Sequence, residues 1–129
     1  MQIEIVSLAR YENVRRILEH VPMAHVSRGL TGDEALETLS KYGIYINSSY
    51  YGGAKSIHMG KIGKWASVLR SIDGLKGIKI SMEDDILFEP QKWNRITSYL
   101  NGITNYSTRK PILRASKYSA FIVYNGNTI

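Results

Sequence analysis

The sequence predicts one α/β domain with a largely parallel sheet, because strand-like and helix-like stretches alternate along it. Short stretches rich in β-branched residues are followed by longer ones whose apolar residues recur every three or four positions. The chain has 129 residues, of which 43% are hydrophobic and 22% charged, as is ordinary for a globular protein. No repeat, low-complexity tract or linker divides it, so we expect a single domain over residues 1–129.

The first predicted elements are a strand, a helix and a second strand. Residues 3–8 form a short apolar stretch dominated by β-branched residues, which predicts a buried strand. Residues 11–21 carry apolar side chains at helical spacing, and Pro22 ends that pattern. Residues 23–26 favour a short second strand.

Two more helices are expected in the middle of the chain. Thr31 and Glu34 have the spacing of a capping box, which predicts a helix from this point to Tyr42. Residues 47–53 are rich in serine, tyrosine and glycine, which predicts a loop. Apolar periodicity then predicts a helix over about 60–72.

The last part of the sequence contains the clearest strand. Apolar and polar residues alternate over 78–82, and three acids follow directly. Pro90 suits the first position of a helix that we expect over 90–100. Two further strands are predicted over 111–114 and 118–124.

Basic residues outnumber acidic ones, 17 against 11, which gives a formal net charge of +6. All the acids lie at or before Glu89, so the surplus is carried by the basic residues that follow it. A surplus of this kind favours a polyanionic partner: a nucleic acid, an acidic membrane or a nucleotide phosphate. The absence of cysteine excludes disulfides, a thiol nucleophile and a thiolate zinc site.

The sequence carries no recognisable targeting signal. Its first residues include an acid and no long apolar stretch, so they do not have the pattern of a signal peptide. No window approaches the roughly twenty apolar residues of a membrane helix. We therefore expect a cytoplasmic protein without a transmembrane segment.

In open α/β sheets, ligands bind beyond the carboxyl ends of the strands. This rule directs attention to two segments, Ser7-Leu8-Ala9-Arg10 and Glu83-Asp84-Asp85. In an extended backbone alternate side chains face the same way, so we expect Glu83 and Asp85 to converge and Asp84 to point elsewhere. Two carboxylates and the phosphate oxygens of a substrate would suit Mg²⁺ or Mn²⁺. The alternative is that these acids only stabilise the start of the following helix.

Basic side chains near these segments are candidates for phosphate contacts. Arg10 follows the first strand, where a guanidinium can bind a phosphate or a base. Lys61 and Lys64 lie near an expected helix start, where lysines and free backbone N–H groups together can hold phosphate. Neither a Walker loop nor a Gly-x-Gly-x-x-Gly pattern is present.

Four segments of the sequence occur in an order known from one enzyme family. They are Ser7-Leu8-Ala9-Arg10 with Arg15-Arg16, Gly60 to Val68, the stretch from Ile80 to Phe88 around Glu-Asp-Asp, and Tyr118 to Val123. Together they resemble glycosyltransferases of the GT-A type, in particular family 25, the lipopolysaccharide and collagen galactosyltransferase group. The resemblance implies a three-layer Rossmann-like domain that binds a nucleotide sugar, with UDP-hexose favoured, and transfers the sugar to a hydroxyl of a glycan.

The resemblance also implies roles for individual residues. Asp85 is expected to bind Mn²⁺ or Mg²⁺, with Glu83 as a second ligand or a ribose contact. The expected nucleotide-sugar contacts are Ser7, Leu8, Arg10, Lys61, Lys64 and Asp84. No residue is assigned as the catalytic base.

The sequence departs from the family pattern in three ways. Val68 stands where the family has histidine, and Lys61 stands where it has glutamate. Members of the family also continue beyond the last matching strand. The expectation is therefore a compact virus-encoded or truncated member, with a partner domain or chain completing the site.

Two other functions use the same residues and stay open. A Mg²⁺-dependent nuclease or phosphotransferase would use the three acids and the basic surface. A module that binds nucleic acid or a nucleotide-sugar donor without catalysis would use the basic residues alone. The phosphates of a nucleotide sugar already account for the positive charge, so nucleic acid is not required as a partner.

Overall fold

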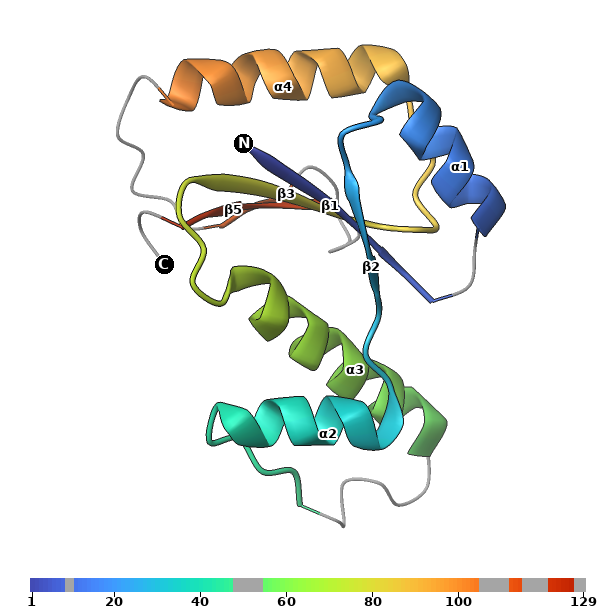
Figure 1. Cartoon of the computed structure of the whole chain (residues 1–129), viewed down its shortest axis with the longest axis vertical. Helices are drawn as coiled ribbons and strands as arrows, with labels where there is room; N and C mark the ends of the chain where they lie inside the picture. Colours follow the sequence, from blue (N-terminus) through green and yellow to red (C-terminus); the bar gives the residue numbers. More distant parts are fainter. Residues whose placement is uncertain (9–10, 48–54, 105–111, 115–120, 127–129) are drawn as a thin grey trace. The chain divides into compact units, whose positions relative to one another are not determined.

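The computed structural model describes residues 1–8, 11–47, 55–104, 112–114 and 121–126 (Figure 1). The strands are β1 (Gln2–Ser7), β2 (His25–Arg28), β3 (Ile78–Glu83), β4 (Ile112–Arg114) and β5 (Phe121–Asn125). The helices are α1 (Tyr11–His20), α2 (Gly32–Lys41), α3 (Lys55–Ile72) and α4 (Pro90–Thr104). Among these described helices, none has both the length and the apolar composition needed to cross a bilayer.

The chain divides into two compact units, which are described separately. The first unit consists of Met1–Ser27 and Gly74–Ile129, and the second of Arg28–Asp73. Each contains an apolar cluster of its own. The prediction of one domain over residues 1–129 stays a prediction.

The predicted order of strands and helices is confirmed, while several bounds differ. The helix predicted from about Gly60 begins at Lys55 in the structure. The prediction missed these first residues because the polar residues among them interrupt the apolar periodicity on which it relied. β2 begins at His25 rather than Met23, and α4 continues to Thr104. Residues 48–53 of the predicted loop and 118–120 of the last predicted strand lie outside the described residues.

The predicted capping box at the start of α2 is wrong. Thr31 is the N-cap residue, but its side chain makes no capping hydrogen bond. Both carboxylate oxygens of Glu34 instead accept hydrogen bonds from Nη2 of Arg28, at 2.8 and 2.7 Å. The guanidinium therefore binds the carboxylate that would have completed the box.

The sheet of the first unit has the strand order β2-β1-β3-β5-β4. β1 pairs parallel with β3, and β5 pairs antiparallel with both β3 and β4. β1, β3 and β4 therefore share one direction, and β5 opposes them. β4 and β5 are joined by a short connection. Because a parallel crossover needs about a dozen residues or more, two strands joined in this way pair antiparallel.

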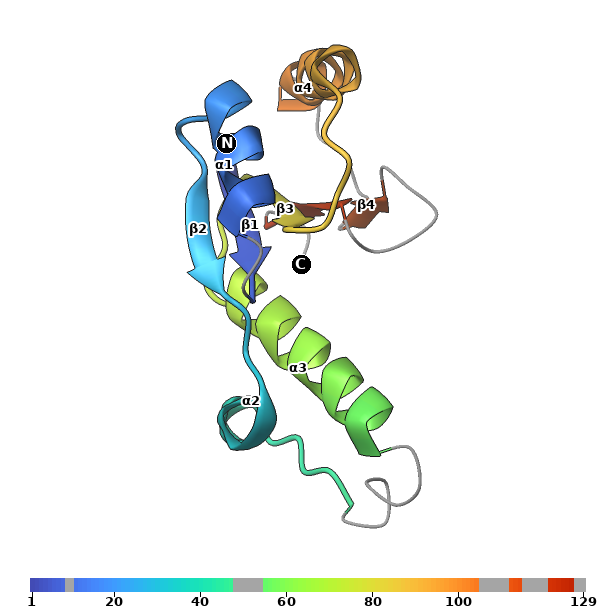
Figure 2. The same cartoon turned by 90° about the vertical axis from the view of Figure 1, so that its right-hand side faces the viewer.

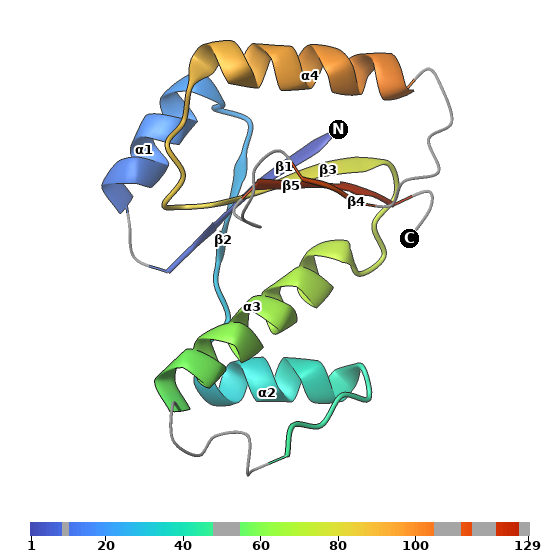
Figure 3. The same ribbon diagram turned by 180° about the vertical axis from the view of Figure 1, so that it is seen from behind.

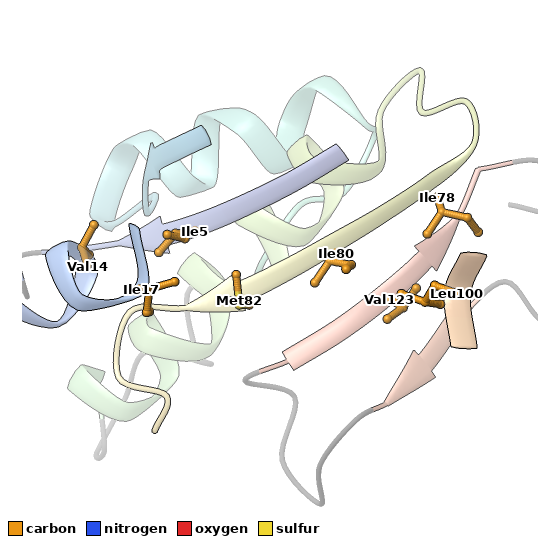
Figure 4. Packing of buried hydrophobic residues seen from close by; sticks show 8 residues of the cluster. All are labelled: Ile5, Val14, Ile17, Ile78, Ile80, Met82, Leu100 and Val123. Carbon is orange, nitrogen blue, oxygen red and sulfur yellow. The ribbon is translucent and has the colours of Figure 1, made fainter. Parts of the chain in front are cut away.

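Helices α1 and α4 pack on one face of this sheet (Figures 1 and 3). Figure 4 shows the cluster between them, formed by Ile5, Val14, Ile17, Ile78, Ile80, Met82, Leu100 and Val123. The alternate positions predicted to point inward from β3 supply three of these side chains. Burying each large aliphatic side chain contributes roughly 1.5–3 kcal/mol, so this cluster holds the strands and helices of the unit together.

The second unit is built by packing α2 against α3. Its apolar cluster consists of Leu30, Ala35, Leu39, Ile62 and Ala66. Ser67 Oγ accepts a hydrogen bond of 3.1 Å from the backbone N–H of Leu30. Gly63 allows this close approach, because a Cβ at that position would collide with the Leu30 carbonyl oxygen.

Candidate functional site

The strand order changes direction at β1: the strand that follows β1 in the sequence pairs on one side of it, and the later strands lie on the other side. β2 lies on one side of β1 and β3 on the other (Figure 2). In open α/β sheets the crevice at such a switch point, beyond the carboxyl ends of the strands, is where ligands bind. The register places Val6 beside Glu83, so the two segments singled out from the sequence, after β1 and after β3, lie side by side there.

Asp84 joins these two strand ends. Its side chain is buried, with 7% of the residue exposed. Asp84 Oδ2 accepts hydrogen bonds from Ser7 Oγ at 2.9 Å and from the Leu8 backbone N–H at 3.1 Å. The Asp84 backbone N–H donates to the Val6 carbonyl oxygen at 3.1 Å. These hydrogen bonds hold the two strand ends together, and the predicted contacts of Ser7 and Asp84 with a nucleotide sugar stay a prediction.

Asn13, in the first turn of α1, holds the backbone that follows β3. Its Nδ2 donates one hydrogen bond to the carbonyl oxygen of Asp84 and another, of 3.0 Å, to that of Ile86. Sequence reasoning missed this residue, because a lone asparagine early in a helix gives no signal for contacts this distant in sequence. Its effect is to fasten the start of the β3–α4 segment, residues 84–89, to α1.

Phe88 anchors the other end of the β3–α4 segment. Its ring stacks on His20 with a centroid distance of 5.3 Å, and it lies 5.7 Å from the ring of Trp93. Both Ile86 and Phe88 pack against the main apolar cluster. The segment is therefore held at Asp84, Ile86 and Phe88.

Burial alternates along the β3–α4 segment. Asp84 is buried and Ile86 and Phe88 are half-buried, whereas Asp85, Leu87 and Glu89 are exposed. Leu87 has 84% of its surface exposed. The residues that anchor the segment thus alternate with residues that face outward, and Asp85 is the outward carboxylate nearest the end of β3.

Glu83 is half-buried and does not belong with the exposed residues Asp85, Leu87 and Glu89. β3 ends at Glu83, and Asp84 and Asp85 form a turn. The extended backbone on which the predicted convergence of Glu83 and Asp85 relied therefore stops before Asp85. The charge of Glu83 acts on Tyr124: burial raises the pKa of the Tyr124 hydroxyl most, and the negative charges of Glu4 and Glu83 raise it further.

The two lysines of the predicted phosphate site do not lie at a helix start. α3 begins at Lys55, so Lys61 and Lys64 come after its first turn. The free N–H groups belong to the first four residues of a helix, so the predicted combination of lysines with those groups is wrong. Lys61 is exposed and Lys64 is half-buried, and both belong to the second unit.

The remaining predicted contacts follow β1. Leu8 is 63% exposed, next to the buried Ser7. Arg10 lies outside the described residues. An exposed apolar side chain thus follows β1 at the same edge of the sheet where Asp85 follows β3.

The described residues can be compared with what a metal site requires. Within the described ranges, no three His, Cys, Asp or Glu side chains form a group that could hold a metal ion. Mg²⁺ and similar cations are often bound by only one or two carboxylates together with the phosphates of a substrate. Asp85 offers one exposed carboxylate of this kind, and a metal site there stays a prediction.

No protein-family model and no curated protein matches this sequence. A proposal for the function therefore has to start from the residues at the switch point. There, a buried carboxylate joins two strand ends, an exposed carboxylate follows it, and exposed apolar side chains lie on both segments.

Proposed function

We propose that this protein is a metal-dependent glycosyltransferase that transfers a sugar from a nucleotide diphosphate donor to an acceptor hydroxyl. The observation that carries the proposal is the placement of the exposed Asp85 at the switch point, on a segment fixed by Asp84 and Asn13. The resemblance of the four sequence segments to GT-A glycosyltransferases of family 25 supplies the reaction. It favours UDP-hexose as the donor, a glycan as the acceptor and a three-layer Rossmann-like domain as the fold.

In this proposal Asp85 holds Mn²⁺ or Mg²⁺ together with the donor diphosphate. The bound metal would neutralise negative charge on the departing diphosphate. Asp84 does not contact the donor directly but keeps the ends of β1 and β3 together, so that Asp85 and Leu8 reach the ligand from neighbouring segments. Glu83, as a second ligand or ribose contact, stays a prediction.

Transfer to a hydroxyl also requires a base that removes the acceptor proton. In this sequence the carboxylates lie at or before Glu89. A carboxylate base would therefore come from that part of the chain or from a partner. The basic residues after Glu89 would favour the approach of an anionic donor.

A thermal-shift panel of UDP-, GDP-, CMP- and dTDP-sugars, each with and without Mn²⁺, tests the proposal. A ligand that binds the folded state raises the midpoint of unfolding, so we expect a UDP-hexose to raise it more when Mn²⁺ is present than when it is absent. Asp33→Asn, at an exposed acid of α2, is the control and should respond like the wild type. If no nucleotide sugar changes the midpoint with Mn²⁺, the proposal is wrong.

The net charge of +6 favours a second candidate, a Mg²⁺-dependent nuclease or phosphotransferase that uses the same acids. Incubation with DNA and RNA in the presence of Mg²⁺ distinguishes the two. Cleavage that Asp85→Ala abolishes would support the nuclease. Binding of nucleic acid that weakens steeply with salt and ignores metal would instead indicate a non-catalytic binding module.

A further inference from the structure

Asn13 contacts the backbone on both sides of Asp85. Its Nδ2 donates to the carbonyl oxygen of the residue before Asp85 and to that of the residue after it. Two carbonyl oxygens can only accept, so the side-chain group that meets them must be a donor. The carboxamide N–H₂ of asparagine meets this need, whereas an aspartate of the same shape would face both carbonyls with an acceptor.

The side chain of Asp84 is fixed separately. Its carboxylate is bound by Ser7 and Leu8, which belong to the end of β1. The turn is thus attached to β1 through a side chain and to α1 through its backbone carbonyls. These attachments leave the Asp85 side chain exposed.

We infer that Asn13 is a positioning residue for Asp85 in the binding of a metal and a nucleotide diphosphate. Asn13 contacts the backbone of the turn, and it acts by holding that turn in one conformation before the ligand arrives. Without it, ordering the turn would be a cost of ligand binding, since fixing a backbone residue opposes association. The inference rests on the proposed function and adds to it the residue that organises the site.

The test compares donor binding in the presence of Mn²⁺ with binding in EDTA. Calorimetry with UDP-hexose gives both affinities for the wild type and for Asn13→Ala, Asn13→Asp and Asp85→Asn. We expect Asn13→Ala to weaken binding about tenfold in Mn²⁺, as loss of preorganisation should, and to leave binding in EDTA unchanged. Asn13→Asp should weaken it further, and Asp85→Asn should make the two affinities equal.

Asn94→Asp is the matched control, because it makes the same chemical change at an exposed position of α4. We expect it to bind like the wild type under both conditions. The midpoint of thermal unfolding is measured for each variant, so that only folded protein is compared. If Asn13→Asp does not fold, Asn13→Ala carries the test.

Three results would overturn the inference. If Asn13→Ala weakens binding equally in Mn²⁺ and in EDTA, the residue supports the fold in general and not Asp85. If neither affinity changes, Asn13 does not act on the site. Both of these results leave the proposed function standing, whereas a wild type that shows no gain in affinity with Mn²⁺ removes the proposed function and the inference together.

Discussion

Two buried carboxylates of the first unit, Glu4 and Asp84, are held in different ways. Glu4 lies within β1, 5% exposed, with Lys79 Nζ at 3.2 Å from its Oε2. It also accepts hydrogen bonds from Ser27 Oγ at 3.0 Å and from Ser81 Oγ at 3.4 Å. Asp84 Oδ2 accepts from a hydroxyl and a backbone N–H at the strand ends.

The difference is between a carboxylate paired with a cation inside the sheet and a carboxylate that joins two strand ends. The charge of Glu4 is balanced by the half-buried Lys79, and its partners come from the two neighbouring strands, β2 and β3, so its interactions serve the fold. Asp84 Oδ2 is instead bound by two neutral donors at the strand ends, next to the exposed Asp85.

The largest effect on stability is expected from Lys79→Met. This change leaves the Glu4 carboxylate buried without its cation, which costs about 3–5 kcal/mol of unfolding free energy. The companion variant Glu4→Gln/Lys79→Met removes both charges and should recover most of the loss. Urea denaturation measures both, and a double variant as unstable as Lys79→Met would show that the charge imbalance is not the cause.

Asp84→Ala should have the next largest effect. It leaves the Ser7 hydroxyl and the Leu8 N–H without their acceptor, at a cost of about 2–4 kcal/mol. Asp84→Asn keeps an acceptor oxygen of the same shape and removes the charge, so it should lose less stability. If Asp84→Asn and Asp84→Ala unfold at the same urea concentration, the hydrogen bonds to this side chain do not hold the strand ends.

The dependence of stability on pH should reflect the raised pKa of Tyr124, a buried tyrosine on which the charges of Glu4 and Glu83 act. Burial and the two carboxylates raise the pKa of Tyr124 above its ordinary value of 10.0. The stabilisation from the protonated hydroxyl is therefore complete below pH 10.0 and is lost as the pH rises through the folded pKa. Urea denaturation at about pH 8 and about pH 11 should show a larger loss for the wild type than for Tyr124→Phe. Equal losses would contradict this account of Tyr124.

The smallest effect on stability is expected from Leu87→Ser, because Leu87 is 84% exposed. Surface changes of this kind usually alter the unfolding free energy by less than about 0.5 kcal/mol. Donor binding should nevertheless weaken about threefold to tenfold, since Leu87 faces outward with Asp85 and offers an apolar contact to a base or a sugar ring. Met23→Ser, at another exposed apolar residue, should change neither quantity.

Much of the fold could be predicted from the sequence, because apolar periodicity encodes it directly. The alternation over 78–82 predicted β3 and its inward face, and the strand-end rule directed attention to the segments after β1 and β3, which the register places side by side. Alternation gave no signal for the Glu4–Lys79 pair, because that pair joins charged side chains from two different strands.

The organisation of the candidate site could not be predicted in the same way. Asp84 and Asn13 act through hydrogen bonds between residues 71 to 77 positions apart. Such contacts depend on which strand ends become neighbours, and no local pattern of residue types encodes that. The error at Glu34 has a different cause: the capping-box pattern considers only Thr31 and Glu34, whereas Arg28, which precedes the helix, binds the Glu34 carboxylate.

The central claim is that Asp85 binds a metal together with a nucleotide-sugar donor, and calorimetry of UDP-hexose binding to Asp85→Ala tests it most directly. The account predicts that Mn²⁺ strengthens binding to the wild type, that Asp85→Ala gains no affinity from Mn²⁺, and that Asp33→Asn binds like the wild type. The same Mn²⁺-dependent affinity in Asp85→Ala as in the wild type would contradict the account.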